Sequence, residues 1–189
     1  MDIESKLEAA QNYLVGEQFK EAFDIFQCLN RSHPNNSQVL LNLGWLYQTG
    51  SGVDADIDKS IIIYQMAAEK GEVLADYYLA TVFKSRNEIQ KSIEHFKKSA
   101  DSGHSSSAYW LGEIYRQGDG CDVDLRQAEH YLTLAKEAGH VFAKRDIALA
   151  NIKGTFGKRK ILSGLVGYLS SVLEGIKITY KNPNSHDMR

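Results

Sequence analysis

One stretch of this sequence occurs twice, and the repetition limits what the chain can fold into. Residues 43–60 read LGWLYQTGSGVDADIDKS and residues 111–128 read LGEIYRQGDGCDVDLRQA. Leucine, glycine, tyrosine and aspartate return at matching positions after 68 residues, which is typical of a repeat protein. Each copy joins an apolar segment at helical spacing to a Gly-x-Gly turn and to an aspartate that precedes a second segment. The pattern predicts a helix-turn-helix unit that stacks on its neighbours.

Leu43 provides the reference position for aligning the other repeat units, and the residues that align with it are called the leucine column. Spacings of 32 to 36 residues connect one column, made of Ala9, Leu43, Leu79, Leu111 and Ile147. A small residue follows this column in the later units, and small residues let two helices approach closely. The alignment on this column predicts a single repeat domain over residues 1–176, with units at about 3–36, 37–72, 73–104, 105–140 and 141–176. A basic tail is expected at 177–189.

Two known repeat families share these spacings. The first unit resembles a tetratricopeptide repeat through Tyr13, Gly16, Ala22, Phe26 and Pro34. The later units resemble the Sel-one-like (SLR) repeat family, in which the leucine of this column, the Gly-x-Gly loop, the aspartate and a closing glycine recur. The resemblance implies an all-α fold, a right-handed α/α superhelical solenoid of about five helix-turn-helix repeats.

The resemblance also implies a function without catalysis. Such proteins are scaffolds or adaptors that hold a polypeptide in a concave groove, at positions two before, two after and five after the leucine column. In this chain the predicted groove residues are Leu41, Trp45, Tyr77, Lys84, Tyr109, Glu113, Arg116 and Arg145. Aromatic and arginine side chains are enriched at interface hot spots. The alternative for Tyr77 and Tyr109 is packing between helices.

The last unit has an unusual outer face. Leu162, Val166, Leu169 and Leu173 follow one another at i, i+4, i+7 and i+11, in columns that are polar or charged in most earlier second helices. A terminal repeat normally needs a polar outer face. Burial of four such side chains is worth on the order of 6 to 12 kcal/mol, so we expect a docking face here. Four occupants stay open: residues 177–189, a second copy of the chain, another protein, or a membrane surface.

A basic flank, Lys158, Arg159 and Lys160, precedes this stripe. Residues 1–152 hold 15 Lys or Arg against 22 Asp or Glu, so the flank contrasts with an acidic body. Basic residues beside an apolar helix suit an anionic lipid surface as well as an acidic protein. The alternative function is therefore a peripheral membrane-associated accessory component of an envelope or polysaccharide machinery. Serine, glycine and charge interrupt the helix, so no span is predicted, and nucleic acid is not an expected partner.

The candidate metal-binding and catalytic motifs lack residues that their chemistry requires. Asp54, Asp56 and Asp58 resemble a calcium loop, but its sixth and twelfth positions lack the required glycine and glutamate. Asp56 is better explained as a helix N-cap. His104 and His140 share a column without a third ligand. We therefore expect no enzyme activity, no cofactor, no metal and no small-molecule substrate.

Cellular location is predicted from weak signals. The first residues, MDIESKLEAAQN, lack the basic and apolar regions of a signal peptide. The two cysteines are far apart and form no disulfide framework. The cytoplasm is the expected location, with attachment at the periphery of a membrane as the alternative.

Overall fold

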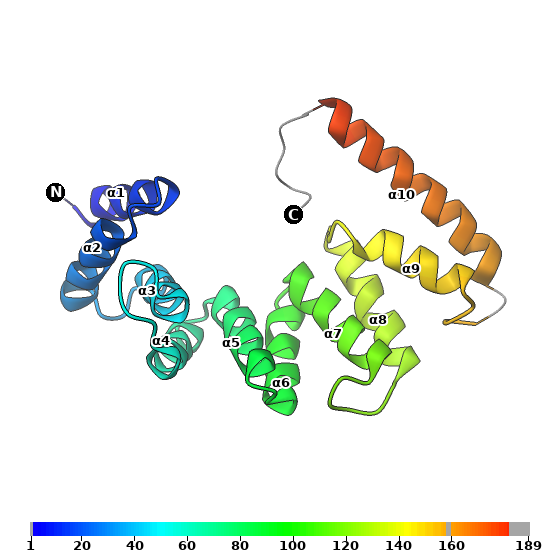
Figure 1. The fold of residues 1–189 in the computed structure, drawn as a ribbon, viewed down its shortest axis with the longest axis horizontal. Helices are drawn as coiled ribbons and strands as arrows, with labels where there is room; N and C mark the ends of the chain where they lie inside the picture. The colour runs from blue at the N-terminus through cyan, green and yellow to red at the C-terminus, as the bar shows by residue number, and fades with distance from the viewer. Residues whose placement is uncertain (1, 158–159, 182–189) are drawn as a thin grey trace. The chain divides into compact units, whose positions relative to one another are not determined.

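The computed structural model describes residues 2–157 and 160–181, with the backbone alone for 176–181. Within these residues every regular element is a helix, which confirms the predicted all-α repeat fold. The chain divides into two compact units, residues 1–102 and 103–189, here called unit 1 and unit 2. Figure 1 shows that both units are made of successive helical hairpins.

Unit 1 contains three hairpins. Its helices are α1 (Ile3–Val15), α2 (Phe19–Ser32), α3 (Ser37–Thr49), α4 (Ile57–Glu69), α5 (Val73–Ser85) and α6 (Ile89–Asp101). Each first helix contacts the second helix of its own hairpin, and α2 and α4 also contact the first helix of the hairpin that follows. This arrangement places α1, α3 and α5 in equivalent positions of successive repeats.

Small residues in the predicted columns bring the two helices of a hairpin together. Gly44 on α3 lies against the Tyr64 ring on α4, where a Cβ atom added to the glycine would be 2.5 Å from a ring carbon. In the next hairpin, the Ser92 hydroxyl on α6 donates to the carbonyl of Ala80 on α5 at 2.8 Å. Tyr64 is fully buried at its contact with Gly44. The repeat alignment therefore identified residues that set the distance between the two helices of a hairpin.

Unit 2 contains two hairpins, α7 (Ser105–Gln117) with α8 (Leu125–Glu137), and α9 (Ala143–Ile152) with α10 (Ile161–Lys181). Gly112 on α7 packs against Leu132 on α8, as Gly44 packs against Tyr64. Gly164 on α10 is buried against the backbone of α9, in the column that contains Ser92. The last hairpin therefore follows the repeat geometry where its helices meet.

The two Gly-x-Gly loops have the same conformation. Gly50 and Gly118 both adopt a φ of 71°, in the left-handed region that favours glycine. In each loop the backbone N–H of an aspartate donates to a tyrosine carbonyl at 2.9 Å, from Asp56 to Tyr47 and from Asp124 to Tyr115. The Asp56 carboxylate then accepts from Lys59 N at 2.9 Å. This bond confirms Asp56 as the N-cap of α4.

Two features depart from the sequence-based expectations. Gly175 aligns with glycines that follow earlier second helices, yet α10 continues through it to Lys181. Residues 177–181 of the predicted tail are therefore helical, and residues 182–189 lie outside the described part of the chain. Tyr168, which shares its column with the buried Tyr64, is 36% exposed. Tyr64 is covered by Tyr78 of the following hairpin, whereas α10 is the last helix described.

Candidate functional site

Three first helices of unit 1 line one small pocket. Its walls come from α1, α3 and α5, and its volume is about 180 Å³. The lining residues are Leu14, Leu41, Asn42, Trp45 and Tyr78. Leu41 and Trp45 are two of the predicted groove residues, and Leu14 occupies the position five after the column residue Ala9. The pocket thus lies where the repeat geometry places a groove.

Aromatic contacts hold the walls of this pocket in place. Trp45 packs against Phe19 with ring centroids 5.9 Å apart. Tyr78 stacks on Tyr64 at 5.2 Å, with the two ring planes only 9° apart. The Tyr64 hydroxyl donates to Gln48 Oε1 at 2.8 Å. Burial raises the pKa of both tyrosine hydroxyls, so both remain protonated donors at neutral pH.

The structure places Tyr77 and Lys84 outside the lining of this pocket. Tyr77 is half-buried and its ring contacts Tyr78 and Phe96, the packing alternative named above. Lys84 is half-buried on the same helix. Sequence reasoning missed Asn42 and Tyr78, which both stand one position before the leucine column. No shared residue type marks that column, which holds Glu8, Asn42, Tyr78, Trp110 and Asp146, so no signal in the sequence pointed to them.

In unit 2, Tyr109 and Arg145 meet at one carboxylate. The Tyr109 hydroxyl on α7 donates to Asp146 Oδ2 on α9 at 2.7 Å. Arg145 Nε donates to the other oxygen, Oδ1, at 2.9 Å. Burial and the bond to Asp146 both raise the pKa of Tyr109. Asp146, which was not predicted, thus joins Tyr109 and Arg145, two predicted groove residues on successive first helices.

The other two predicted residues of unit 2 form an ion pair on α7. Arg116 donates to both oxygens of Glu113, through Nε at 2.9 Å and through Nη2 at 2.5 Å. Gln117 Nε2 adds a third bond to Glu113 at 3.0 Å. The carboxylate of Glu113 raises the pKa of Arg116. A fork of two parallel bonds fixes the guanidinium plane and leaves other N–H groups for a ligand.

Histidines of the shared column lie beside this cluster. The His140 ring stacks on Tyr109 with centroids 4.2 Å apart. His104 Nδ1 is 2.8 Å from the Ser107 hydroxyl. The described residues contain no group of three or more His, Cys, Asp or Glu that could hold a metal ion. His140, in the turn that precedes α9, packs on α7, whereas His104 stands at the N-cap position of α7 and bonds within its first turn.

Acidification is expected to destabilise unit 2 through these two histidines. Burial lowers the pKa of both His104 and His140, and for His140 the nearby Asp146 opposes this effect in part. The unfolded chain therefore binds more protons at these two positions than the folded chain as the pH falls through the ordinary pKa of about 6.5, so stability falls as pH falls. Thermal unfolding between about pH 7.5 and about pH 5.5 measures this loss. The double variant His104→Gln with His140→Gln should lose less; an unchanged loss contradicts the assignment.

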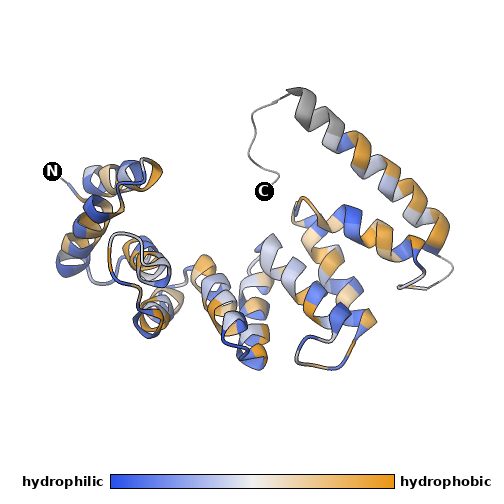
Figure 2. Ribbon diagram, viewed as in Figure 1, coloured by the Kyte–Doolittle hydropathy of each residue, from blue (hydrophilic) through white to orange (hydrophobic). Residues whose placement is uncertain are grey.

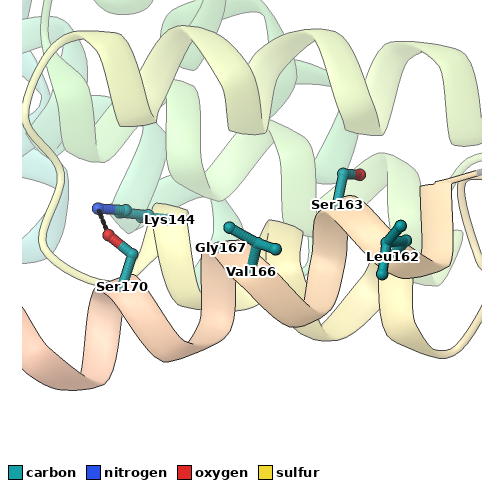
Figure 3. A pocket seen from close by; sticks show the side chains of 6 residues that line it. All are labelled: Lys144, Leu162, Ser163, Val166, Gly167 and Ser170. Carbon is teal, nitrogen blue, oxygen red and sulfur yellow. Dashed lines mark hydrogen bonds between the residues drawn. The ribbon is translucent and has the colours of Figure 1, made fainter.

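The predicted docking face is exposed to solvent along α10. Leu162, Val166, Leu169 and Leu173 are 73%, 65%, 63% and 60% exposed. An open groove of about 690 Å³ includes two of them in its lining, and Figure 3 shows all the residues that line it: Lys144 of α9 and Leu162, Ser163, Val166, Gly167 and Ser170 of α10. Lys144 of α9 crosses its end and donates to the Ser170 hydroxyl at 3.0 Å and to Glu174 at 2.5 Å.

The basic flank is described only at Lys160. Its ammonium group donates to the carboxylate of Glu129 on α8. Lys158 and Arg159 lie outside the described residues. Among the described residues, none of the helices could form a membrane span.

Comparison with known proteins identifies the repeats. The sequence model of the Sel1 repeat matches residues 37–72, 74–104 and 105–140, more than half of the chain. A putative sel1-like repeat-containing protein, L21 of Acanthamoeba polyphaga mimivirus, is 36% identical over 95 residues. That alignment covers 46% of this chain and 18% of the viral protein, so the chain spans about a fifth of this relative.

Solved structures share the fold. A Sel1 repeat protein from Oxalobacter formigenes matches with a TM-score of 0.78 and 22% identity, over 89% of this chain and 70% of that one. The antigen c5321 from uropathogenic Escherichia coli, which displays an SLR fold, matches with a TM-score of 0.79 and 24% identity, over 92% of this chain and 38% of its own. These likenesses agree with the helical hairpins, the loop glycines and the family match. The chain belongs to the Sel1 repeat family.

Proposed function

We propose that this protein is a non-catalytic scaffold that binds a polypeptide partner along its first helices. Sel1 repeats generally serve as scaffolds for protein interactions, and that role supports the proposal. The observation that carries it is the pocket of unit 1, where side chains from α1, α3 and α5 converge. A surface built from successive first helices suits an extended or helical segment that runs across several repeats.

The size of the pocket argues for a protein side chain as its ligand. Small-molecule sites usually occupy about 300 to 1,000 Å³. The pocket of unit 1 has about 180 Å³ and is lined mainly by apolar side chains, so one apolar side chain of a partner suits it. Trp45 and Tyr78 are rigid, large and half-buried, which are properties of hot-spot residues. We infer that they anchor a leucine-sized or aromatic residue of the partner.

Unit 2 offers polar recognition instead. Tyr109, Glu113, Arg116 and Arg145 form ion pairs and hydrogen bonds on α7 and α9. A guanidinium carries five N–H donors, so Arg116 and Arg145 have donors beyond the bonds described here. These groups suit the carbonyl or carboxylate oxygens of a bound peptide. Each unit would then recognise a polypeptide through its own contacts, apolar in unit 1 and polar in unit 2.

A charge at the pocket rim is expected to abolish peptide binding. Peptides are first selected from a random displayed library on the full chain, and their affinities are measured by fluorescence anisotropy. Asn42→Glu places a carboxylate beside Trp45 without removing a core side chain, so a buried apolar anchor loses at least about tenfold in affinity. Gln65→Glu on α4 is the matched control, because it adds the same charge on an exposed helix face.

The proposal fails under two results. Selected peptides that bind Asn42→Glu and wild type equally do not use the pocket. A library that yields no peptide, although circular dichroism shows a folded chain, contradicts polypeptide binding itself. Trp45→Ala is a second probe, with Trp110→Ala of α7 as its control, since these are the two tryptophans of the chain.

A further inference from the structure

Unit 1 has another cavity, here called the α4–α6 pocket. Its volume is about 480 Å³, and side chains of α4, α5 and α6 line it. Figure 2 shows both hydrophobic and hydrophilic residues on these three helices. Asp76 in this lining stands two positions before Tyr78 of the first pocket, so the two residues lie about 200° apart around α5. The two pockets therefore open on different sides of that helix.

A mostly buried pair of charged and polar groups lies in the α4–α6 pocket. The side chains of Asp76 on α5 and His95 on α6 are 18% and 16% exposed, and His95 Nδ1 is 2.8 Å from Asp76 Oδ1. An ionised carboxylate only accepts hydrogen bonds, so Nδ1 carries the proton and Nε2 of the neutral ring is an acceptor. Stacking on Phe83 at 5.4 Å holds the ring in place. The pair thus offers Asp76 Oδ2 and His95 Nε2 to a hydrogen-bond donor.

Glu69 adds a second carboxylate to the lining. It is the last residue of α4 and is exposed. Among the described residues no hydrogen bond or ion pair involves Glu69. Lys98 also lines the pocket, but it donates to Glu94 at 2.8 Å, which offsets its charge. The remaining lining groups are therefore acceptors, two of them negatively charged.

The surrounding field also favours a cation. The lining comes from the last turns of α4 and α6 and from the first turn of α5, so two helix carboxyl ends and one amino end meet here. Two partial negative charges thus stand against one partial positive charge. Over residues 1–102, 15 Asp or Glu outnumber 10 Lys or Arg. An excess of negative charge attracts positively charged ligands.

We propose that the α4–α6 pocket binds the guanidinium group of an arginine side chain from a polypeptide partner. A guanidinium carries five N–H donors in one plane, which suits several acceptors on different helices, whereas a lysine ammonium is a point charge. The lining also includes Ala68 and Leu79, and these apolar residues suit the methylene groups of the arginine stem. The site is separate from the pocket proposed above for an apolar anchor, and neither proposal depends on the other.

Two exposed apolar residues beside the pocket favour a polypeptide over a small free cation. Ile62 and Met66 on α4 are 57% and 39% exposed. They precede Glu69 by seven and three residues, so the three side chains share one face of the helix. A small cation in the pocket leaves both apolar side chains in water. A polypeptide with an apolar residue next to its arginine covers them as well.

Titration of the full chain with N-acetylarginine N-methylamide tests the site by NMR. The probe should shift the imidazole resonances of His95 with a dissociation constant in the millimolar range. The citrulline analogue, which has the same size and no charge, should bind at least about tenfold more weakly. Glu69→Lys should cause a similar loss for the arginine probe. Glu4→Lys is the matched control, because Glu4 is exposed on α1 of the same unit.

The site proposal fails if the arginine and citrulline probes bind equally, or if Glu69→Lys binds the arginine probe as wild type does. Circular dichroism checks that both variants fold, which is expected because both changes lie on exposed positions. Asn42→Glu should bind the arginine probe like wild type, since Asn42 belongs to the other pocket. Loss of one kind of binding can therefore be distinguished from loss of the other.

The source of the guanidinium has its own measurement. A peptide with leucines on both sides of its arginine should bind at least about fivefold more tightly than the capped arginine. Ile62→Ser with Met66→Ser should remove this gain and leave the affinity for the capped arginine unchanged. Agmatine is the small free cation for comparison. Agmatine that binds as tightly as the peptide overturns the assignment to a polypeptide.

Discussion

Gly52→Ala is expected to lower the free energy of unfolding of unit 1 by about 2 to 5 kcal/mol. Gly52 has a φ of 71°, and the loop that carries it lies against the start of α2. A Cβ atom would lie 2.3 Å from the Phe19 carbonyl oxygen and 2.6 Å from Lys20 N. Both neighbours are backbone atoms, so the clash is relieved only by moving the loop or the helix. Two costs therefore add: a strained φ and a lost contact between hairpins.

A second glycine separates these two costs. Gly71 has a φ of 83°, yet nothing lies within 4 Å of the position that a Cβ atom would occupy. Gly71→Ala should thus cost only the conformational strain, about 1 kcal/mol. Urea denaturation followed by Trp45 fluorescence, in a Trp110→Phe background, measures both variants. Equal losses for Gly52→Ala and Gly71→Ala would mean that the contact with α2 contributes nothing.

Gly164→Val is expected to loosen α10 from α9, at a cost of about 2 to 4 kcal/mol. A Cβ at Gly164 would lie 2.8 Å from the Ala148 carbonyl oxygen and 2.8 Å from Ile152 N, and both are backbone atoms of α9. The larger valine side chain forces the two helix axes apart. The thermal unfolding temperature and amide hydrogen exchange along α9 and α10 report the change.

The matched control for this change lies on the same helix. At Gly175 a Cβ atom would have no neighbour within 4 Å. Because glycine disfavours the helix interior, Gly175→Ala should stabilise α10 by about 0.5 to 1 kcal/mol. The two glycine substitutions are thus expected to have opposite signs. A loss at both positions would show that general properties of α10, and not its approach to α9, decide the result.

Repeated contacts could be predicted from the sequence because they leave the same residue at the same place in every copy. Gly44 and Gly112 are both small because the facing helix is close, and Asp56 and Asp124 both cap a helix. The divergent last hairpin also has a small residue at the position where its helices meet, because Gly164 lies at the position that the repeat alignment predicts. Periodicity therefore identified the fold and the separation of its helices.

Contacts that occur once could not be predicted in this way. The bond from Tyr109 to Asp146 joins residues 37 positions apart and has no counterpart in another repeat among the bonds described. The position of Tyr78 in the pocket of unit 1 follows from its stacking on Tyr64, which depends on side-chain rotamers. The helix α10 continues through Gly175, whereas Gly71, Gly103 and Gly139 adopt a positive φ after their helices end. Composition alone does not separate these two uses of glycine.

The helix pairs that share most contacts are neighbours along the chain, and this has a consequence for how the protein folds. Contacts between residues close in sequence give a low contact order, which speeds folding because little loop entropy is lost before contacts form. We expect each hairpin to nucleate locally and to recruit the next, so that refolding from urea is fast. A new protein emerging from the ribosome could then complete unit 1 before residues 103–189 have been synthesised.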